Sequence, residues 1–213
     1  MKIYFIRHAQ VGSNLKNIAY NKKNEDLTKE GKKQAEKLAK KLIRLNIDKI
    51  FISKSKRAYQ TILPLLKLQS ISVKKDKRLD DCKYGIFSGL TLKEAKGKHP
   101  KIFKKRWEDK WNIPIPKGES FKDVAERLCS FFKNLEREAK KFQFENIVIV
   151  THATNLKVFL IQYLKFNIKK ADSVQFKNTS ISIFEFKNNN IKTEVINDFS
   201  HLNNDTSQSK RIH

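Results

Sequence analysis

The 213-residue sequence is 39% hydrophobic, which is enough for one sizeable domain around a single buried core and excludes an intrinsically disordered chain. Its 46 Lys and Arg residues outnumber 22 Asp and Glu residues, and the net charge of +24 favours anionic partners, either nucleic acid or phosphorylated metabolites. The lysines are spread along the chain rather than gathered in one basic arm, so we do not expect a nucleic-acid partner.

The predicted strands and helices alternate along the chain. Strands are expected at short apolar runs, and helices where apolar side chains recur at helical spacing. In chain order they are a strand at Lys2–Arg7, a helix at 29–45, a strand at 49–53, a helix at 55–66, a strand at 71–74, a helix at 121–139, a strand at 147–150, a helix at 155–164, and a hairpin of strands at 180–186 and 191–196. The alternation predicts an α/β fold, a three-layer α/β/α sandwich around a central mixed, mostly parallel sheet.

The sequence also predicts where in the cell the protein is found. No stretch approaches the ~20 apolar residues of a membrane-spanning helix, and the apolar run at 3–6 is too short for a signal peptide. Cys82 and Cys129 lie far apart and form no CxxC pair, so reduced thiols are expected. We therefore expect a cytoplasmic protein without membrane contacts.

Two histidines follow predicted strands, at the sheet edge where such folds bind ligands. His8 comes directly after Arg7, and His152 follows the strand at 147–150. A neutral imidazole can attack phosphorus, an arginine can bind two phosphate oxygens at once, and a protonated imidazole can hold another phosphate oxygen. Taken alone, either histidine is more simply explained as a buried or helix-capping residue.

Two further motifs carry polar residues suited to phosphate chemistry. Arg57 lies in the first turn of the helix that follows Ser53, so its guanidinium can point back toward the strand ends. Asp80 and Asp81 precede two of the six glycines, and a carboxylic acid there could protonate a leaving oxygen and then activate water. The ordinary alternatives are a solvated arginine and a polar turn.

The order of these motifs resembles that of the histidine phosphatase superfamily, also called the phosphoglycerate mutase-like family. The family opening Arg-His-Gly-Glu/Gln-Thr-x-x-Asn is similar to Arg-His-Ala-Gln-Val-Gly-Ser-Asn at 7–14, and Ser-x-x-x-Arg-Ala-x-Gln-Thr is matched throughout 53–61. Four more family motifs have counterparts here: Leu-Thr-x-x-Gly-x-x-Gln-Ala at 27–35, Leu-x-Glu-x-x-x-Gly-x-x-x-Gly at 79–89, Gly-Glu-Ser at 118–120 and Val-x-His-Gly at 150–153. The resemblance covers residues 1–202.

The resemblance implies a role for each matched residue. His8 would be the catalytic nucleophile that accepts the phosphate. Asp81, rather than Asp80, would be the catalytic proton donor, because its spacing to the next two glycines matches that of the family's acid. The residues implied to bind the substrate phosphate are Arg7, Asn14, Arg57, His152 and Ala153.

The chain departs from the family pattern at several of these positions. Ala9 and Ala153 replace glycines, and Val11 replaces a threonine. Asp81 and Ser88 stand where glutamate is common. None of these changes removes a core catalytic group, so they bear on rate and substrate choice rather than on the class of reaction.

The sequence predicts neither a metal nor a cofactor. Its five histidines form no HxxxH or HExxH pattern, the two cysteines are isolated, and no GxxxxGK[ST] loop is present. Trp107 and Trp111 could stack on a substrate ring or serve packing.

We therefore expect a metal-independent phosphatase that hydrolyses phosphate monoesters of small metabolites through a phosphohistidine on His8. It should resemble the broad-specificity or alpha-ribazole phosphatases. Residues 1–202 should form a single domain in which the segment at 80–118 caps the pocket, followed by a flexible polar tail at 203–213.

Three alternatives are compatible with parts of the sequence. A cofactor-dependent phosphoglycerate mutase would use the same core, but mutases carry a longer insertion than the about thirty residues between Gly89 and Gly118. The others are a basic nucleic-acid-binding module and a catalytically inactive family member. The intact set of Arg7, His8, Arg57 and His152 counts against the inactive member. The physiological substrate and the oligomeric state, including a homodimer, are left open.

Overall fold

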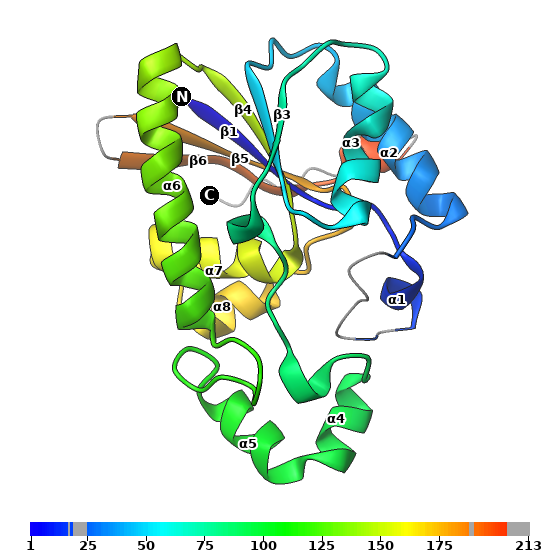
Figure 1. Cartoon of the computed structure of the whole chain (residues 1–213), viewed down its shortest axis with the longest axis vertical. Coiled ribbons are helices and arrows are strands. Elements are labelled where there is room, and N and C mark those ends of the chain that lie inside the picture. Colours follow the sequence, from blue (N-terminus) through cyan, green and yellow to red (C-terminus); the bar gives the residue numbers. More distant parts are fainter. Residues whose placement is uncertain (17, 19–24, 188–189, 204–213) are drawn as a thin grey trace.

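The computed structural model describes residues 1–16, 18, 25–187 and 190–203 (Figure 1). Of the polar tail expected at 203–213, all but Asn203 lies outside the described residues. No helix within them is long and apolar enough to cross a membrane.

A six-stranded sheet of order β3-β2-β4-β1-β5-β6 forms the centre of the molecule (Figure 1). The parallel strands are β1 (Lys2–Arg7), β2 (Lys49–Ile52), β3 (Val73–Lys75) and β4 (Asn146–Thr151). The hairpin of β5 (Ile181–Lys187) and β6 (Asn190–Asp198) adds an antiparallel edge next to β1. The prediction of a mixed, mostly parallel sheet is confirmed.

Helices cover both faces of this sheet. They are α2 (Lys29–Leu42) and α3 (Lys56–Leu66) on one face, and α6 (Phe121–Phe142) and α7 (Ala153–Leu164) on the other (Figure 1). Because successive strand side chains point to opposite faces, Phe5 of β1 packs in the core with α6 and α7, and Ile6 packs in the core with α2 and α3. The predicted three-layer α/β/α sandwich is therefore confirmed.

Several helix ends differ from the predicted bounds. α2 ends at Leu42 rather than 45, and Leu45 still packs against the core, which explains why its apolar spacing extended the prediction. α6 continues past 139 and ends where Gln143 adopts the left-handed conformation. Outside the 80–118 segment, two described helices that were not predicted are too short for a periodic signal, namely α1 (Gly12–Leu15) and α8 (Ile168–Ser173).

The segment at 80–118 lies at the lower end of the molecule in Figure 1. It contains α4 (Leu92–Lys98) and α5 (Pro100–Glu108) and has a small core of its own around Phe87, Ala95 and Ile115. This core holds the two short helices together, because neither is long enough to be stable by itself in water.

Gly85 lies in the close turn where this segment meets residues 116–118. Its φ is +47°, and a Cβ atom there would lie 1.9 Å from the carbonyl oxygen of Pro116. We therefore expect Gly85→Ala to lower stability by about 1–2 kcal/mol or more, a fall of roughly 2–8 °C in the thermal midpoint. Gly97→Ala is the matched control, because Gly97 is exposed inside α4 with open space around it, and alanine should raise stability there. Equal midpoints for the two variants would contradict this account of the turn.

Candidate active site

His8 and His152 lie side by side where β1 and β4 end. The two strands are parallel neighbours in the sheet, and the His8 N–H donates to the Thr151 carbonyl oxygen at 3.0 Å. The centroids of the two imidazole rings are 5.1 Å apart, and both side chains are buried. The sheet therefore brings together two histidines that most of the chain separates.

The hydrogen bonds of His8 define its tautomer. Its Nδ1 atom lies 2.8 Å from the Ala9 carbonyl oxygen, which can only accept, so Nδ1 carries the proton. The lone pair on Nε2 is then available for attack on phosphorus. Burial, together with the charges of Arg57 and Arg7, holds the pKa of His8 well below its ordinary value, so the ring is neutral at pH 7.

Two further contacts hold the backbone around His8. The Ala9 N–H donates to Thr61 Oγ1 at 2.8 Å, and that hydroxyl donates to the Arg57 carbonyl oxygen at 2.7 Å. The side chain of Asn178 donates to the His8 carbonyl oxygen at 2.8 Å. Thr61 belongs to the matched motif at 53–61, whereas nothing in the sequence marked Asn178, which reaches the site through the pairing of β5 with β1.

His152 has protein partners on both ring nitrogens. Arg57 Nη2 lies 3.1 Å from His152 Nδ1, and because a guanidinium can only donate, Nδ1 accepts. Nε2 therefore carries the proton and donates to Ser53 Oγ at 3.0 Å. Burial and the charge of Arg57 lower the pKa of His152 well below its ordinary value. The sequence allowed a protonated imidazole at this position, whereas His152 is neutral in this structure.

Arg7 and Arg57 present buried N–H groups without protein partners. Nε and Nη1 of Arg57 and Nε of Arg7 are buried and make no hydrogen bond within the described residues. The guanidinium planes are held by other contacts: Arg7 Nη1 donates to the Phe176 carbonyl oxygen, and Arg57 Nη2 contacts Asp81 and His152. Because buried donors are nearly always paired in folded proteins, these N–H groups indicate a site for an anion such as phosphate.

Asp81, and not Asp80, faces this group. Its Oδ2 atom lies 3.3 Å from Arg57 Nη2 and 3.5 Å from His152 Nδ1. Asp80 instead accepts from the backbone N–H of Lys54 at 2.7 Å. Desolvation raises the pKa of Asp81, although the charge of Arg57 opposes the rise. A raised pKa favours the protonated carboxyl that a general acid requires.

Asn14 and Ala153 contribute at the edges of the site. Asn14 Oδ1 accepts from the Val11 N–H at 3.1 Å and from the Asn178 side chain at 3.2 Å, so its amide nitrogen can donate to a ligand. Ala153 is the first residue of α7, directly after His152. The first N–H groups of a helix have no partner inside it and favour anions.

A cavity of 520 Å³ opens beside Arg57 and Asp81. The first residues of the 80–118 segment form much of its wall, and three lysines lie around it, Lys54, Lys83 and Lys117. Positive charge at this position favours an anionic substrate. Among the residues that the structure describes, no group of three or more His, Cys, Asp or Glu could hold a metal ion.

The two tryptophans lie away from this cavity wall. Trp107 stacks on Phe103 with ring centroids 4.2 Å apart and lines a second, smaller cavity of 180 Å³. Trp111 packs against the core under α6. Trp111 therefore serves packing, whereas Trp107 remains 43% exposed.

Residues 3–199 match the profile of the histidine phosphatase superfamily (branch 1). The chain belongs to this superfamily. The family membership that its ordered motifs predicted is confirmed, and the match supports an enzyme of the histidine phosphatase type.

The histidine phosphatases similar to this chain include different enzymes. Phosphoserine phosphatase 1 of Hydrogenobacter thermophilus is 28% identical over 187 residues, which cover 88% of this chain and 87% of that protein. The 2,3-bisphosphoglycerate-dependent phosphoglycerate mutase of Afipia carboxidovorans is 30% identical over 165 residues, which cover 75% of this chain and 79% of the mutase. The crystal structure of phosphoserine phosphatase from Entamoeba histolytica in complex with 3-phosphoglyceric acid has a TM-score of 0.82 at 22% identity, covering 94% of this chain and 98% of that one, and so shares the fold.

Proposed function

We propose that this protein hydrolyses phosphate monoesters of small metabolites without a metal, through a phosphohistidine on His8. The observation that carries the proposal is the set of buried, unpaired N–H groups on Arg7 and Arg57 beside a neutral histidine. An anion with several oxygens would satisfy these donors, and a phosphoryl group has three. The proposal also places the protein in the cytoplasm, in keeping with the free thiols of Cys82 and Cys129.

In the first chemical step, the Nε2 lone pair of His8 attacks phosphorus in line with the ester bond. That bond breaks, and the leaving oxygen takes the proton of the Asp81 carboxyl group. Arg7 and Arg57 donate to the phosphoryl oxygens and offset their charge in the transition state. The phosphate-binding set is completed by the amide of Asn14 and the backbone N–H of Ala153. His152 joins the set in this proposal by donating its Nε2 proton to a phosphoryl oxygen in place of Ser53.

In the second step, water attacks the phosphohistidine. The Asp81 carboxylate now takes a proton from the water, and the bond between phosphorus and Nε2 breaks to release inorganic phosphate. This returns His8 to its neutral form and Asp81 to its acid form. Because the acid form of Asp81 is lost as pH rises through its raised pKa, the first step should slow on the alkaline side.

The 80–118 segment selects the leaving group in this proposal. It supplies Asp81 at its start, and it also supplies Lys83, Tyr84 and Lys117 to the wall of the 520 Å³ cavity. The cavity has room for a small metabolite, and its lysines favour one that carries a further negative charge. The segment therefore acts as the cap predicted from the sequence.

The competing function is phosphoglycerate mutase activity, which the 30% identity to a mutase favours. A mutase must keep its phosphohistidine from water, whereas a phosphatase admits water. The two activities share the same nucleophile and phosphate-binding residues, so a product assay separates them better than a mutation.

We expect the protein to release inorganic phosphate from 3-phosphoglycerate, with a bisphosphate primer and EDTA both present. Metal independence follows from a phosphate site made of Arg and His side chains. The measurement compares phosphate released with 2-phosphoglycerate formed in the same tube. Isomer formation well above phosphate release would reverse the ranking of the two functions. Loss of activity in EDTA that a divalent cation restores would disprove the metal-independent mechanism.

A further inference from the structure

The loop that carries Asp81 is held by the buried side chain of Asn155 on α7. Asn155 Nδ2 donates to the carbonyl oxygens of Leu79 at 2.9 Å and Asp80 at 3.0 Å. It also lies 2.7 Å from Thr151 Oγ1, which itself donates to the Leu79 carbonyl oxygen. Hydrogen bonds from Thr151, the last residue of β4, and Asn155, the third residue of α7, therefore hold the two residues that precede Asp81.

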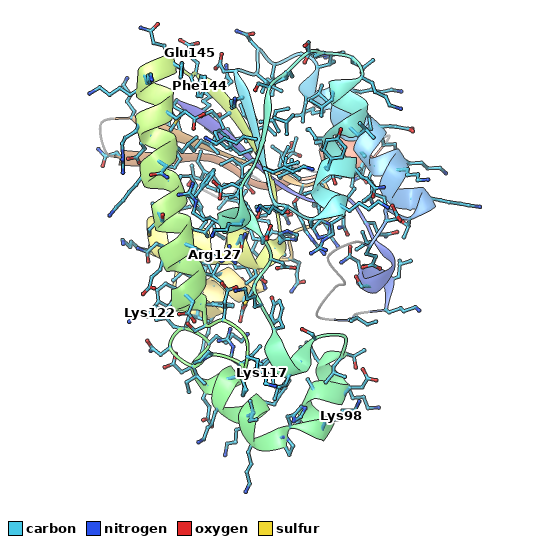
Figure 2. The ribbon with its side chains drawn as sticks, in the orientation of Figure 1. Lys98, Lys117, Lys122, Arg127, Phe144 and Glu145 are labelled. Carbon is cyan, nitrogen blue, oxygen red and sulfur yellow. The ribbon has the colours of Figure 1, made fainter. Side chains whose placement is uncertain are left out.

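Arg127 of α6 extends this contact to the start of the loop. Arg127 Nη2 donates to Asn155 Oδ1 at 3.2 Å, and its Nη1 donates to the Arg78 carbonyl oxygen. The helix α6 lies beside this loop, with Arg127 in its lower half (Figure 2). Both polar ends of the Asn155 amide are therefore hydrogen-bonded, the nitrogen to the loop and the oxygen to Arg127.

Glu119 completes the network on the other side of Asp81. Its Oε1 atom accepts from Arg127 Nε at 3.1 Å, and its Oε2 atom accepts from the backbone N–H of Lys83 at 2.8 Å. The backbone N–H of Glu119 also donates to the Lys83 carbonyl oxygen at 2.7 Å. The chain is thus held at 78–80 before the acid and at 83 after it.

We infer that Asn155, Arg127 and Glu119 are positioning residues that hold Asp81 at the leaving oxygen. This rests on the proposed role of Asp81 as general acid. The acid must lie within hydrogen-bond reach of the ester oxygen, and a displacement of about 1 Å can cost roughly 100-fold in rate. Asp81 Oδ1 accepts from the adjacent Cys82 N–H at 3.0 Å, and Oδ2 has only long contacts, at 3.3 Å to Arg57 and 3.5 Å to His152. The position of the carboxyl group therefore depends mainly on the backbone of its own loop.

The network is separate from the phosphate-binding residues. Among the hydrogen bonds given above, Asn155, Arg127 and Glu119 contact the loop, each other and the Thr151 hydroxyl, and the phosphate donors belong to Arg7 and Arg57. Its loss should therefore affect protonation of the leaving group and leave phosphate binding intact. The two effects can be told apart by substrates that differ in leaving group.

Asn155→Ala should reduce kcat/KM for β-glycerol phosphate by roughly 10- to 100-fold, and kcat/KM for p-nitrophenyl phosphate by less than about threefold. This ratio reports the first step, in which the leaving group departs, and not the later hydrolysis of the phosphohistidine, which is common to both esters. The alkyl leaving group needs a proton, whereas the nitrophenolate leaves without one. KM for the alkyl ester, whose first step is slow, should stay within about twofold, because the phosphate donors are unchanged. Glu119→Gln, which keeps size but weakens the acceptor, should show the same selectivity at smaller magnitude.

Val158→Ala is the matched control, since Val158 is fully buried on the same helix and contacts the core rather than the loop. It should lower the thermal midpoint without changing the ratio of the two kcat/KM values. In an Asp81→Asn background, Asn155→Ala should lower kcat/KM for the alkyl ester only slightly further, because the acid is already absent.

An equal loss on both esters in Asn155→Ala and Glu119→Gln, or a full additional loss in the Asp81→Asn background, would overturn the positioning role. If Asp81→Asn itself showed no dependence on the leaving group, the proposed general acid would be wrong instead. The single variant of Asp81 therefore distinguishes failure of the proposed function from failure of the inference.

Discussion

Replacing His8 with alanine is expected to abolish both turnover and the covalent phosphoenzyme. His8 supplies the nucleophilic Nε2 atom, because its Nδ1 proton is held by the Ala9 carbonyl oxygen and its pKa is lowered well below the ordinary value. Removal of an essential nucleophile leaves only binding and electrostatic effects, so kcat should fall by at least roughly 10⁴-fold.

The intermediate can be measured by rapid quenching into alkali after mixing with labelled substrate. A phosphohistidine is a phosphoramidate, which survives base, whereas an acyl phosphate on Asp81 would not. The label should therefore appear on the peptide that contains His8. His152→Ala is the control, and it should slow turnover without moving the label. Base-stable label on His152, or near-normal turnover by His8→Ala, would rule out His8 as the nucleophile.

Asp81→Asn is expected to slow hydrolysis of alkyl phosphates by roughly the 10²- to 10⁴-fold that general acids contribute. Asparagine keeps the size of the side chain and its contact with Arg57 but has no acidic proton to transfer. Aryl phosphates should lose much less, because their leaving groups need little protonation. The measurement is kcat/KM for a series of esters of increasing leaving-group pKa, because kcat/KM reports formation of the phosphohistidine and not its hydrolysis, in which Asp81 serves every ester alike.

Asp80→Asn is the matched control for this series. Asp80 contacts the backbone of Lys54 rather than Arg57 or His152, so its replacement should be mild for every ester. If the two variants exchanged effects, the assignment of the acid from the spacing to Gly85 and Gly89 would be wrong by one residue.

Local patterns predicted most of the elements of this fold. The apolar runs of β1 and β4 and the amphipathic repeats of α2 and α6 are signals within single segments, and each element formed within a few residues of its expected place. α1 and α8 were missed, because four and six residues give no measurable period. The bounds of α2 were also overextended, since Leu45 packs in the core without being helical.

The active site was likewise predicted only in part. The candidate residues were found from motif order, since His8, Arg57 and His152 each stand at the end of a strand or the start of a helix. Asn178 and Asn155 were assigned no role, because each acts through contacts with segments distant in sequence. Asn178 reaches His8 only because β5 pairs with β1, and Asn155 reaches the Asp81 loop only because α7 follows the central strand β4.

By itself the sequence determined the class of fold, the family and the residues that could carry phosphate chemistry, because periodicity and motif spacing are properties of the chain. Only the tertiary structure decided the protonation of these residues. His152 is neutral because Arg57 donates to one ring nitrogen and the other donates to Ser53. Arg7 and Arg57 keep unpaired N–H groups because the fold buries them without enough acceptors. Burial and hydrogen-bond partners arise from contacts between distant segments, and no local pattern encodes them.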